Sequence, residues 1–328
     1  MSLNPQSAEL DAAILAIAKR LYGKTPRLQK CQSERNYCAL LSFDDGTADR
    51  IIKIANRSGW AIEVERHLYP AMRMAGLPVP EIEFTHEDNS ELTQAFIVMP
   101  KFSDYTLKEV CQNNHDVAMR AVRSGGQFIR SVSSLFEEEF MAFLDMREVG
   151  AYLAENQKQI DYELDLNLTR KHDPELAEII EHHFSTMSKP STKQLTHGQP
   201  HLRNILADEN GNICAIDWGE SIGMSSPLRD LHLLLNSHDG WSRGTGDPRQ
   251  RAAILEGYGG IDGVGWKELH YWEFRFWVKA LQDYMKFVED PTKDANFVAN
   301  QLRGIISKVR EVSNGGGLIH RLEDDIAK

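Results

Sequence analysis

The sequence lacks the features that mark several classes of protein. Its four cysteines, Cys31, Cys38, Cys111 and Cys214, are scattered over 328 residues and form no C-x-x-C pair. This spacing predicts neither a disulfide framework nor a thiolate metal site, so we expect a reducing, cytoplasmic setting. No apolar run approaches the roughly 20 residues that a membrane helix needs. We therefore expect a soluble protein without a membrane partner.

Basic residues are also few. The chain has 37 Lys and Arg against 48 Asp and Glu, which gives a formal net charge of -11. Sequence-independent binding to nucleic acid or anionic lipid relies on clustered Lys and Arg, so we predict no nucleic-acid partner. A cationic small substrate would suit this charge, but acidity also serves solubility, and the second interpretation is the simpler one.

The spacing of histidines close in sequence does not favour a zinc site. His197 and His201 have the H-x-x-x-H spacing that binds zinc on a helix, but a glycine and a proline between them break helical geometry. His182 and His183 are adjacent, so they cannot share a helical face. We predict no zinc.

The first hundred residues alternate between helical and strand patterns. Apolar residues at helical spacing predict helices over residues 7–22 and 60–75, and the prolines of "GLPVP" end the second one. The strand-like runs "NYCALLSF" and "RIIKIA" flank "DDGTAD", whose Asp-Gly pair is a hairpin signal. A second strand pair, "EIEFTH" and "QAFIVMP", surrounds a polar turn.

The rest of the chain has a mostly helical pattern. Amphipathic stretches predict helices near residues 115–137, 146–165, 174–187 and 266–290. Only "NILADENGNICAIDW" interrupts them, as two short strands around an Asn-Gly turn. The simplest division is an N-terminal β-rich lobe and a C-terminal helical lobe, joined near residues 99–102.

The helix predicted at 266–290 is rich in aromatic residues. Five residues at helical spacing are expected to face the core: Leu269, Trp272, Phe276, Ala280 and Tyr284. Trp277, off this stripe, and the loop residue Trp241 are candidates for an acceptor pocket, because a cation or sugar can lie against an indole face. Asp239, Asp247 and Asp262 lie in nearby Gly-rich loops and could bind a cationic acceptor, although solvated loop acids are more common.

Four residues have the chemistry that phosphoryl transfer needs, namely a cation for the phosphates and oxygen ligands for Mg²⁺. Lys53 lies inside the apolar run "RIIKIA", where its ammonium needs a partner, and Glu65 on the next helix is a candidate. The alternative is an edge-strand Lys that points outward. Asn204 and Asp217 flank a predicted hairpin, which would bring an amide oxygen and a carboxylate to one end of the strand pair. A turn Asn and a strand-end Asp are, however, common in any protein.

Five segments together resemble the aminoglycoside phosphotransferase and choline kinase-like family: "RIIKIA", "EVERHLYPAMRMAGLPVP", "AFIVMPKF", "THGQPHLRNIL" and "AIDWGESIGMSSPLRDL". Their order and spacing match over residues 30–235, about two thirds of the chain. The resemblance implies an α+β, protein-kinase-like fold with two lobes. Residues 1–100 would form the nucleotide-binding lobe, and residues 101–328 a helical lobe that carries catalysis and binds the acceptor.

The resemblance also implies ATP and Mg²⁺ as cofactors and assigns a role to each matching residue. Lys53 would contact the nucleotide phosphates, Glu65 would orient Lys53, and Asn204 and Asp217 would hold Mg²⁺. Asp230 would brace the loop without reacting.

Further positions follow from the same resemblance. Ser33 and Asn36, in "CQSERNY", match a short turn over the phosphates, although this turn lacks the glycines of a true Gly-rich loop. The stretch from Met99 to Lys101 would form the hinge beside the adenine. The implied activity is transfer of the ATP γ-phosphate to a hydroxyl of an aminoglycoside-, choline- or sugar-like acceptor.

Gln199 departs from the family, which has an Asp at this position that is taken to be the catalytic base. A Gln cannot accept a proton near neutral pH, but its carbonyl can still accept a hydrogen bond. Losing a base costs about 10²- to 10⁴-fold, while positioning and electrostatics supply most of the catalysis in phosphoryl transfer. His201 is a candidate substitute base, although a His is common there beside a normal Asp. The sequence is compatible with both a weakened kinase and an inactive nucleotide-binding pseudokinase. It does not determine the acceptor, the choice of ATP or GTP, the oligomeric state, or whether the role is in resistance or in metabolism.

Overall fold

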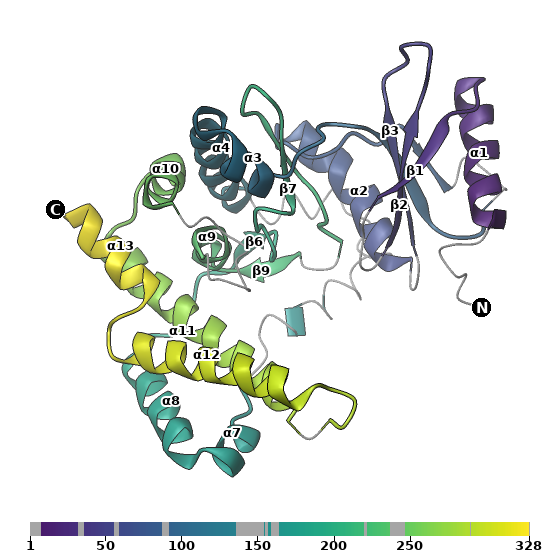
Figure 1. Ribbon diagram of the computed structural model, residues 1–328. Coiled ribbons are helices and arrows are strands. Elements are labelled where there is room, and N and C mark those ends of the chain that lie inside the picture. The colour runs from purple at the N-terminus through teal and green to yellow at the C-terminus, as the bar shows by residue number, and fades with distance from the viewer. Residues whose placement is uncertain are drawn as a thin grey trace.

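The computed structural model describes most of the chain, and the described residues are 8–31, 36–55, 59–86, 92–135, 154, 157–158, 164–219, 222–236, 247–288 and 290–327. An antiparallel five-stranded sheet with two helices comes first, and a mainly helical part follows (Figure 1). The N-terminal sheet and the C-terminal helices lie on opposite sides of the view. The expected order of a β-rich part followed by a helical part is confirmed.

The sheet has the strand order β1-β2-β3-β5-β4. Its strands are β1 (Arg27–Cys31), β2 (Asn36–Ser42), β3 (Arg50–Ala55), β4 (Phe84–Thr85) and β5 (Phe96–Pro100). β2 and β3 form the predicted hairpin, whose turn contains Gly46 at a φ of 85°. β1 was not predicted, because "RLQKC" is an exposed edge strand with no alternation of polar and apolar residues.

Two helices use opposite faces of this sheet. α1 (Ala8–Tyr22) packs Ile14 and Ile17 in one cluster with Ile52 of β3 and Phe96 of β5. α2 (Trp60–Met74) belongs to a different cluster, which includes Ile97 of β5. Because successive strand residues point to opposite faces, the residue after Ile52 faces the side of α2. That residue is Lys53.

The remainder is built from helices and two short strand pairs. The helices are α3 (Leu107–Asn113), α4 (His115–Ser133), α7 (Asn167–His172), α8 (Pro174–Thr186), α9 (Pro227–Leu235), α10 (Pro248–Tyr258), α11 (Gly263–Met285), α12 (Ala295–Ser313) and α13 (Leu318–Ala327). The strand pairs are β6 (Gln194–Thr196) with β9 (Gly223–Ser225), and β7 (Ile205–Ala207) with β8 (Ile213–Ala215). The helix predicted at 146–165 lies mostly outside the described residues.

The buried face of α11 differs from the predicted stripe. Leu269 and Ala280 are buried as expected, but the helix also buries Phe274, Trp277 and Leu281. Trp277 is 2% exposed and belongs to the cluster with α12, so the suggestion that it lines an acceptor pocket is wrong. α11 lies against several other helices, and a helix buried on more than one side has no single apolar stripe.

The loop acids that were candidates for binding an acceptor have local partners where they are described. Asp247 caps α10 by accepting a hydrogen bond from Arg249 N, and Asp262 caps α11 by accepting one from Gly265 N. Asp239 and Trp241 lie outside the described residues. Two of the three acids therefore act as helix caps.

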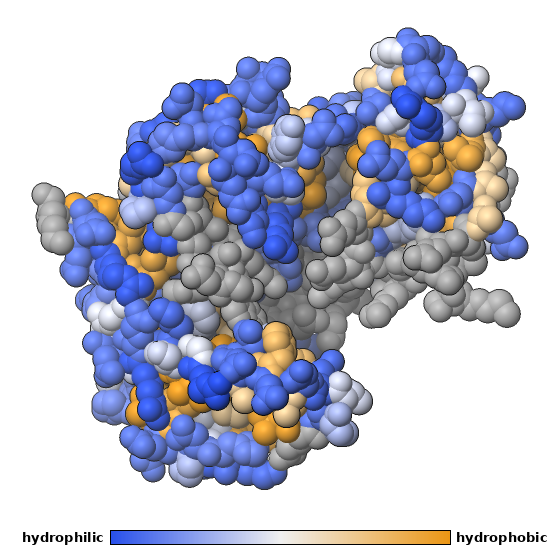
Figure 2. Space-filling view, viewed as in Figure 1, coloured by the Kyte–Doolittle hydropathy of each residue, from blue (hydrophilic) through white to orange (hydrophobic). Residues whose placement is uncertain are grey.

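The face shown in Figure 2 is mostly hydrophilic, with hydrophobic residues gathered in patches, one of them over the region of the sheet. Among the described helices, none is long and apolar enough to cross a membrane.

Candidate active site

Lys53 lies at the centre of a buried network of charges. From β3 its Nζ donates to both carboxylate oxygens of Glu65 on α2, at 2.7 and 2.9 Å, and to Asp217 Oδ1 at 2.9 Å. Glu65 is fully buried, whereas the Asp217 side chain is 43% exposed. Burial alone would lower the pKa of Lys53, but the two carboxylates outweigh it and hold that pKa above its ordinary value. The predicted contact between Lys53 and Glu65 is confirmed, and the alternative of an outward-pointing Lys is wrong.

The β7–β8 hairpin brings Asn204 and Asp217 to the same end of a strand pair. Ile205 pairs with Ala215, and the next residue outward, Ile216, donates its N–H to Asn204 O at 2.9 Å. The hairpin prediction is therefore confirmed. Asn204 Nδ2 donates to the backbone oxygen of Gln199 at 3.1 Å, which leaves its Oδ1 as the atom able to bind a cation.

Asp217 has an unusual backbone. Its φ is 66°, and it is the only residue other than glycine with positive φ in the described part of the chain. Asp is among the few residues that enter this region at modest cost. Such a conformation is typically retained at functional sites, and here it accompanies the carboxylate that contacts Lys53.

Gly219, two residues further on, lets the Asp217 segment approach α2. A Cβ at Gly219 would lie 2.2 Å from the backbone oxygen of Ala61, so no larger residue fits without movement. Its N–H also donates to Glu65 Oε1 at 3.3 Å. Glu65 thus joins β3 to the segment after β8. Gly219 was not among the predicted site residues, and its position directly after Asp217 and Trp218 was the available signal in the sequence.

The loop that begins at His197 is fixed by a buried carboxylate. Asp230 on α9 accepts the backbone N–H of His197 at 2.7 Å and that of Gly198 at 3.0 Å. Burial raises the pKa of Asp230 to about 6, against the opposing effects of Arg229 and of these two N–H groups. The expectation that Asp230 braces this loop is confirmed.

His197 connects the same loop to the β8 segment. Its ring Nε2 lies 3.0 Å from Ile216 O, and its Nδ1 accepts the N–H of Gln199 at 3.3 Å, which corresponds to a neutral ring. The ring is fully buried and packs at 4.4 Å from the Trp218 ring. Burial lowers the pKa of His197 to about 4, so the ring is structural and stays neutral.

Gln199 and His201 follow in this loop. The backbone oxygen of Gln199 accepts both the N–H of His201, at 2.8 Å, and the amide of Asn204. Within the described residues, no hydrogen bond involves the side-chain amide of Gln199, which is half-buried. His201 is also half-buried, and its role as a substitute base stays a prediction.

The remaining predicted site residues lie along the sheet. Asn36 is buried at the start of β2 and pairs with Ala55. Met99 is buried in β5, and Lys101 just beyond it forms ion pairs with two acidic side chains. Ser33 lies outside the described residues. The structure therefore brings Lys53, Glu65, Asn204 and Asp217 together, while the contacts of these other residues with a nucleotide stay predictions.

A cavity of about 250 Å³ opens beside β9 and α11. Its lining includes three cations, Lys189, Lys193 and Arg275, and the aromatic rings of Tyr271 and Trp272. Positive side chains favour an anionic group over a cationic one. This local charge is opposite to the net charge of the chain.

The profile of the phosphotransferase enzyme family, APH, matches residues 35–272. The chain belongs to this family. The matched region contains Lys53, Glu65, the loop from His197 to Asn204, and Asp217. It therefore includes every residue of the charged network described above. No curated protein sequence matches the chain.

Solved structures of the family have the same fold. A spectinomycin phosphotransferase in complex with ADP and spectinomycin is 14% identical, with a TM-score of 0.61 over 93% of this chain and 98% of that one. The GDP complex of an aminoglycoside 2'-phosphotransferase is 14% identical, with a TM-score of 0.60 over 92% and 99% of the chains. The macrolide 2'-phosphotransferase MphH from Brachybacterium faecium is 16% identical, with a TM-score of 0.55 over 88% and 97%. The fold is thus the protein-kinase-like fold predicted from the sequence.

Proposed function

We propose that this protein is a small-molecule phosphotransferase that moves the γ-phosphate of ATP, with Mg²⁺, to a hydroxyl group of its acceptor. The observation that carries the proposal is the contact of Lys53 with both Glu65 and Asp217, with Asn204 beside Asp217 at the end of the hairpin. This set supplies a cation for phosphates and oxygen ligands for a hard metal ion. Residues 1–100 would serve as the nucleotide-binding lobe and residues 101–328 as the catalytic and acceptor-binding lobe.

The donor atoms fit Mg²⁺. Asp217 offers a carboxylate and Asn204 an amide oxygen, and Mg²⁺ prefers one or two such ligands together with water and phosphate oxygens. The 43% exposure of the Asp217 side chain leaves room for those further ligands. When bound, Mg²⁺ would neutralise negative charge on the transferred phosphate.

Lys53 has a specific role in this proposal. An ammonium has three N–H donors, and the structure directs them at the two Glu65 oxygens and at Asp217. The bidentate contact with Glu65 is buried, while the contact with Asp217 is at the exposed side of the network. The bond to Asp217 is therefore the one we expect to be exchanged for a phosphate oxygen when a nucleotide binds.

Gln199 would position the acceptor. Its backbone is fixed by the contacts with His197, His201 and Asn204, while its side-chain amide is not engaged by the described residues. The amide oxygen can accept a hydrogen bond from a substrate hydroxyl and align it. It cannot remove the proton, so the proton must leave with the transferred phosphoryl group or through His201.

The acceptor class is proposed from the family. The names of the similar structures identify spectinomycin, aminoglycoside and macrolide phosphotransferases, so a hydroxyl-rich acceptor of that kind is the first to test. The cationic acceptor suggested by the net charge stays a prediction. Because three cations line the cavity, acceptors that carry an anionic group belong in the same panel.

The test is a phosphotransfer assay with [γ-³²P]ATP and Mg²⁺ against aminoglycosides, macrolides, choline, amino sugars, nucleosides and acidic sugars. The wild type is compared with Gln199→Asp, which restores a base, and with Lys53→Ala, which removes the phosphate contact. We expect transfer to at least one acceptor, about 10²-fold or more faster in Gln199→Asp if the base is limiting. Lys53→Ala should be inactive even under conditions in which circular dichroism shows it folded, a check that is needed because removing Lys53 also leaves Glu65 buried without its partner.

The alternative is a pseudokinase of the same fold, and Gln199 is the observation that favours it. Under this alternative, ATP still raises the melting temperature of the wild type, while the wild type and Gln199→Asp both transfer no phosphate to any acceptor. That combination of results would reject the proposed activity.

A further inference from the structure

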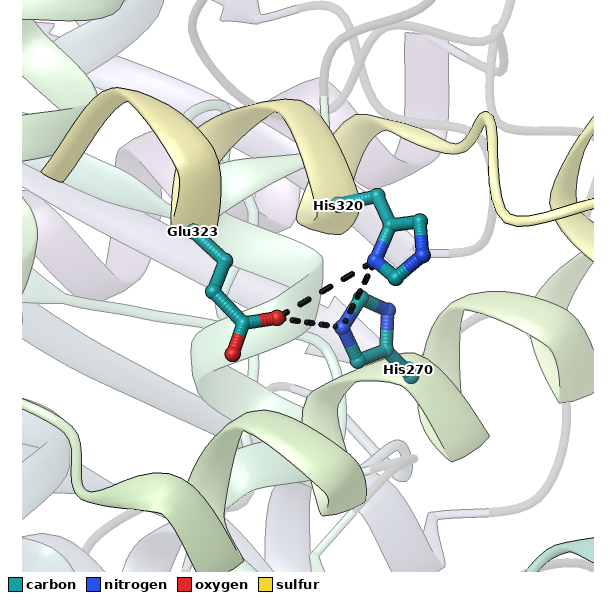
Figure 3. Close-up of side chains that lie close together, drawn as sticks. All are labelled: His270, His320 and Glu323. Carbon is teal, nitrogen blue, oxygen red and sulfur yellow. Dashed lines mark hydrogen bonds and ion pairs between the residues drawn. The ribbon is translucent and has the colours of Figure 1, made fainter. Parts of the chain in front are cut away.

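Three side chains with metal-binding atoms converge between α11 and α13, at the end of the helical part (Figure 3). His270 comes from α11, and His320 and Glu323 come from α13. Because His320 and Glu323 are three residues apart on a helix, they project from the same face. Their ligand atoms and that of His270 all lie within 4.8 Å of one another.

The close contacts within this cluster cannot all be hydrogen bonds at the same time. His270 Nε2 lies 2.9 Å from Glu323 Oε2 and 3.2 Å from His320 Nδ1, and the third separation, between His320 Nδ1 and Glu323 Oε2, is 4.0 Å. A ring nitrogen has one N–H or one lone pair in the ring plane. A proton on His270 Nε2 can therefore point fully at only one of its two neighbours. A cation between the three atoms would contact all of them.

The separations suit a tetrahedral transition-metal ion. Zinc lies about 2.0 to 2.2 Å from His nitrogens and carboxylate oxygens, so two ligands of a tetrahedral zinc are roughly 3.3 to 3.5 Å apart. The three observed separations, 2.9, 3.2 and 4.0 Å, bracket that range. Two imidazoles and one carboxylate are also a ligand set that zinc uses when a water takes the fourth position.

We propose that His270, His320 and Glu323 bind one Zn²⁺ or a similar divalent transition cation, which fastens α13 to α11. The side chains of His320 and Glu323 are 46% and 38% exposed, so an ion can enter from solvent and keep a water ligand. His270 is less accessible, with 18% of its side chain exposed, and forms the inner wall of the site.

The surrounding structure holds the ligands in position before any ion binds. One turn after His270, the buried carboxylate of Glu273 accepts the N–H groups of Leu318 at 2.6 Å and Ile319 at 3.0 Å, at the start of α13. Gly317 permits this contact, since a Cβ there would lie 2.5 Å from Glu273 Oε2. The first turn of α13 is thus fixed on α11, which places His320 opposite His270.

This site is independent of the proposed phosphotransferase centre. Its imidazole nitrogens suit transition metals and disfavour Mg²⁺, which prefers oxygen ligands. A cation that binds only the native state also stabilises it in proportion to the logarithm of the cation concentration. The expected consequence is a stability that depends on Zn²⁺ and not on Mg²⁺.

The experiment uses the full chain without a histidine tag, treated with a chelator and then titrated with Zn²⁺ by calorimetry. We compare the wild type with His320→Gln and Glu323→Gln, both at partly exposed positions, and with His182→Gln as a matched control on the exposed surface of α8. We expect one Zn²⁺ per wild-type chain, an affinity about 100-fold or more weaker in each ligand variant, and no change in the control. Excess Mg²⁺ should not compete.

Two further measurements complete the test. Zn²⁺ should raise the melting temperature of the wild type and of the control but not of the ligand variants, and Co²⁺ should give the intense visible absorption of a tetrahedral site in the wild type alone. Circular dichroism checks that each variant is folded. The Co²⁺ spectrum of the wild type tests the site without any substitution, so it remains informative if a variant does not fold. The proposal is overturned if the wild type binds no stoichiometric Zn²⁺, if the ligand variants bind it as tightly as the wild type, or if Co²⁺ shows only octahedral absorption.

Discussion

Replacing Lys53 by Met should strongly destabilise the protein, and adding Glu65→Gln should recover most of the loss. Lys53 Nζ lies 2.7 Å from a carboxylate that is fully buried, and removing one partner of a buried pair typically costs about 3–5 kcal/mol. Without the ammonium, Glu65 must take up a proton to stay buried. At pH 7, protonating a carboxyl with an ordinary pKa of about 4.3 costs about 4 kcal/mol, because each pKa unit is worth about 1.4 kcal/mol.

The same reasoning fixes a pH dependence. In Lys53→Met, the folded state keeps a proton on Glu65 that the unfolded state releases above a pH of about 4.3, so the destabilisation grows as the pH rises above that value. At pH 5 it should be only about 1 kcal/mol. Gln at position 65 removes the charge but keeps a carbonyl oxygen for the N–H of Gly219, so the double variant should be close to wild-type stability at both pH values.

Urea unfolding, followed by tryptophan fluorescence at pH 7 and pH 5, measures these free energies. Lys267→Met, at an exposed position on α11, is the matched control and should change stability by less than about 0.5 kcal/mol. A Lys53→Met variant as stable as the wild type at pH 7, or a loss that Glu65→Gln does not recover, would refute the buried ion pair as described.

Three other substitutions test the surroundings of the site. Gly219→Ala should destabilise the protein by about 2 kcal/mol or more, because the added Cβ would clash with the backbone of Ala61. It should also weaken nucleotide binding measured by calorimetry. An unchanged melting temperature would contradict the close approach. Asp230→Asn should cost about 2 kcal/mol in urea unfolding, since the amide offers one neutral acceptor oxygen where the carboxylate offers two charged ones to the N–H groups of His197 and Gly198. A loss below about 0.5 kcal/mol would argue against bracing by Asp230. The pKa of about 4 for His197 lies below its ordinary value, so the folded state binds fewer protons than the unfolded state as the pH falls. The free energy of unfolding should therefore fall by about 2 kcal/mol between pH 8 and pH 5. His197→Asn should not show this loss. Parallel stability profiles of the wild type and His197→Asn would contradict the buried neutral ring.

Much of the network at Lys53 could be predicted because its parts have local signals. A Lys inside an apolar strand and an Asn and an Asp that flank a short hairpin are visible in the sequence, and strand periodicity decides which way Lys53 points. The match to the order and spacing of the family's segments then assigned a role to each of these residues. The exposed strand β1 had no such signal, since edge strands need no apolar alternation.

Contacts between distant segments were beyond sequence reasoning. The buried face of α11 depends on helices that cover it from more than one side, so a single stripe predicted Trp277 wrongly. The prediction of no zinc considered only histidines close in sequence. His270 lies 50 residues before His320, and no spacing rule joins them; only the docking of α13 through Glu273 brings them together. Gly219 is likewise explained by a neighbour, Ala61, that is remote in sequence.

The most direct test of the proposed nucleotide site is calorimetric titration of the wild type and Asp217→Asn with ATP, each with and without Mg²⁺. Asn tolerates the positive φ at position 217, so the variant removes the carboxylate charge while sparing the backbone. We expect the wild type to bind ATP more tightly with Mg²⁺ than without it, and Asp217→Asn to lose that increase. A wild type that binds no ATP, or a variant that keeps the full effect of Mg²⁺, would contradict the site formed by Lys53, Asn204 and Asp217.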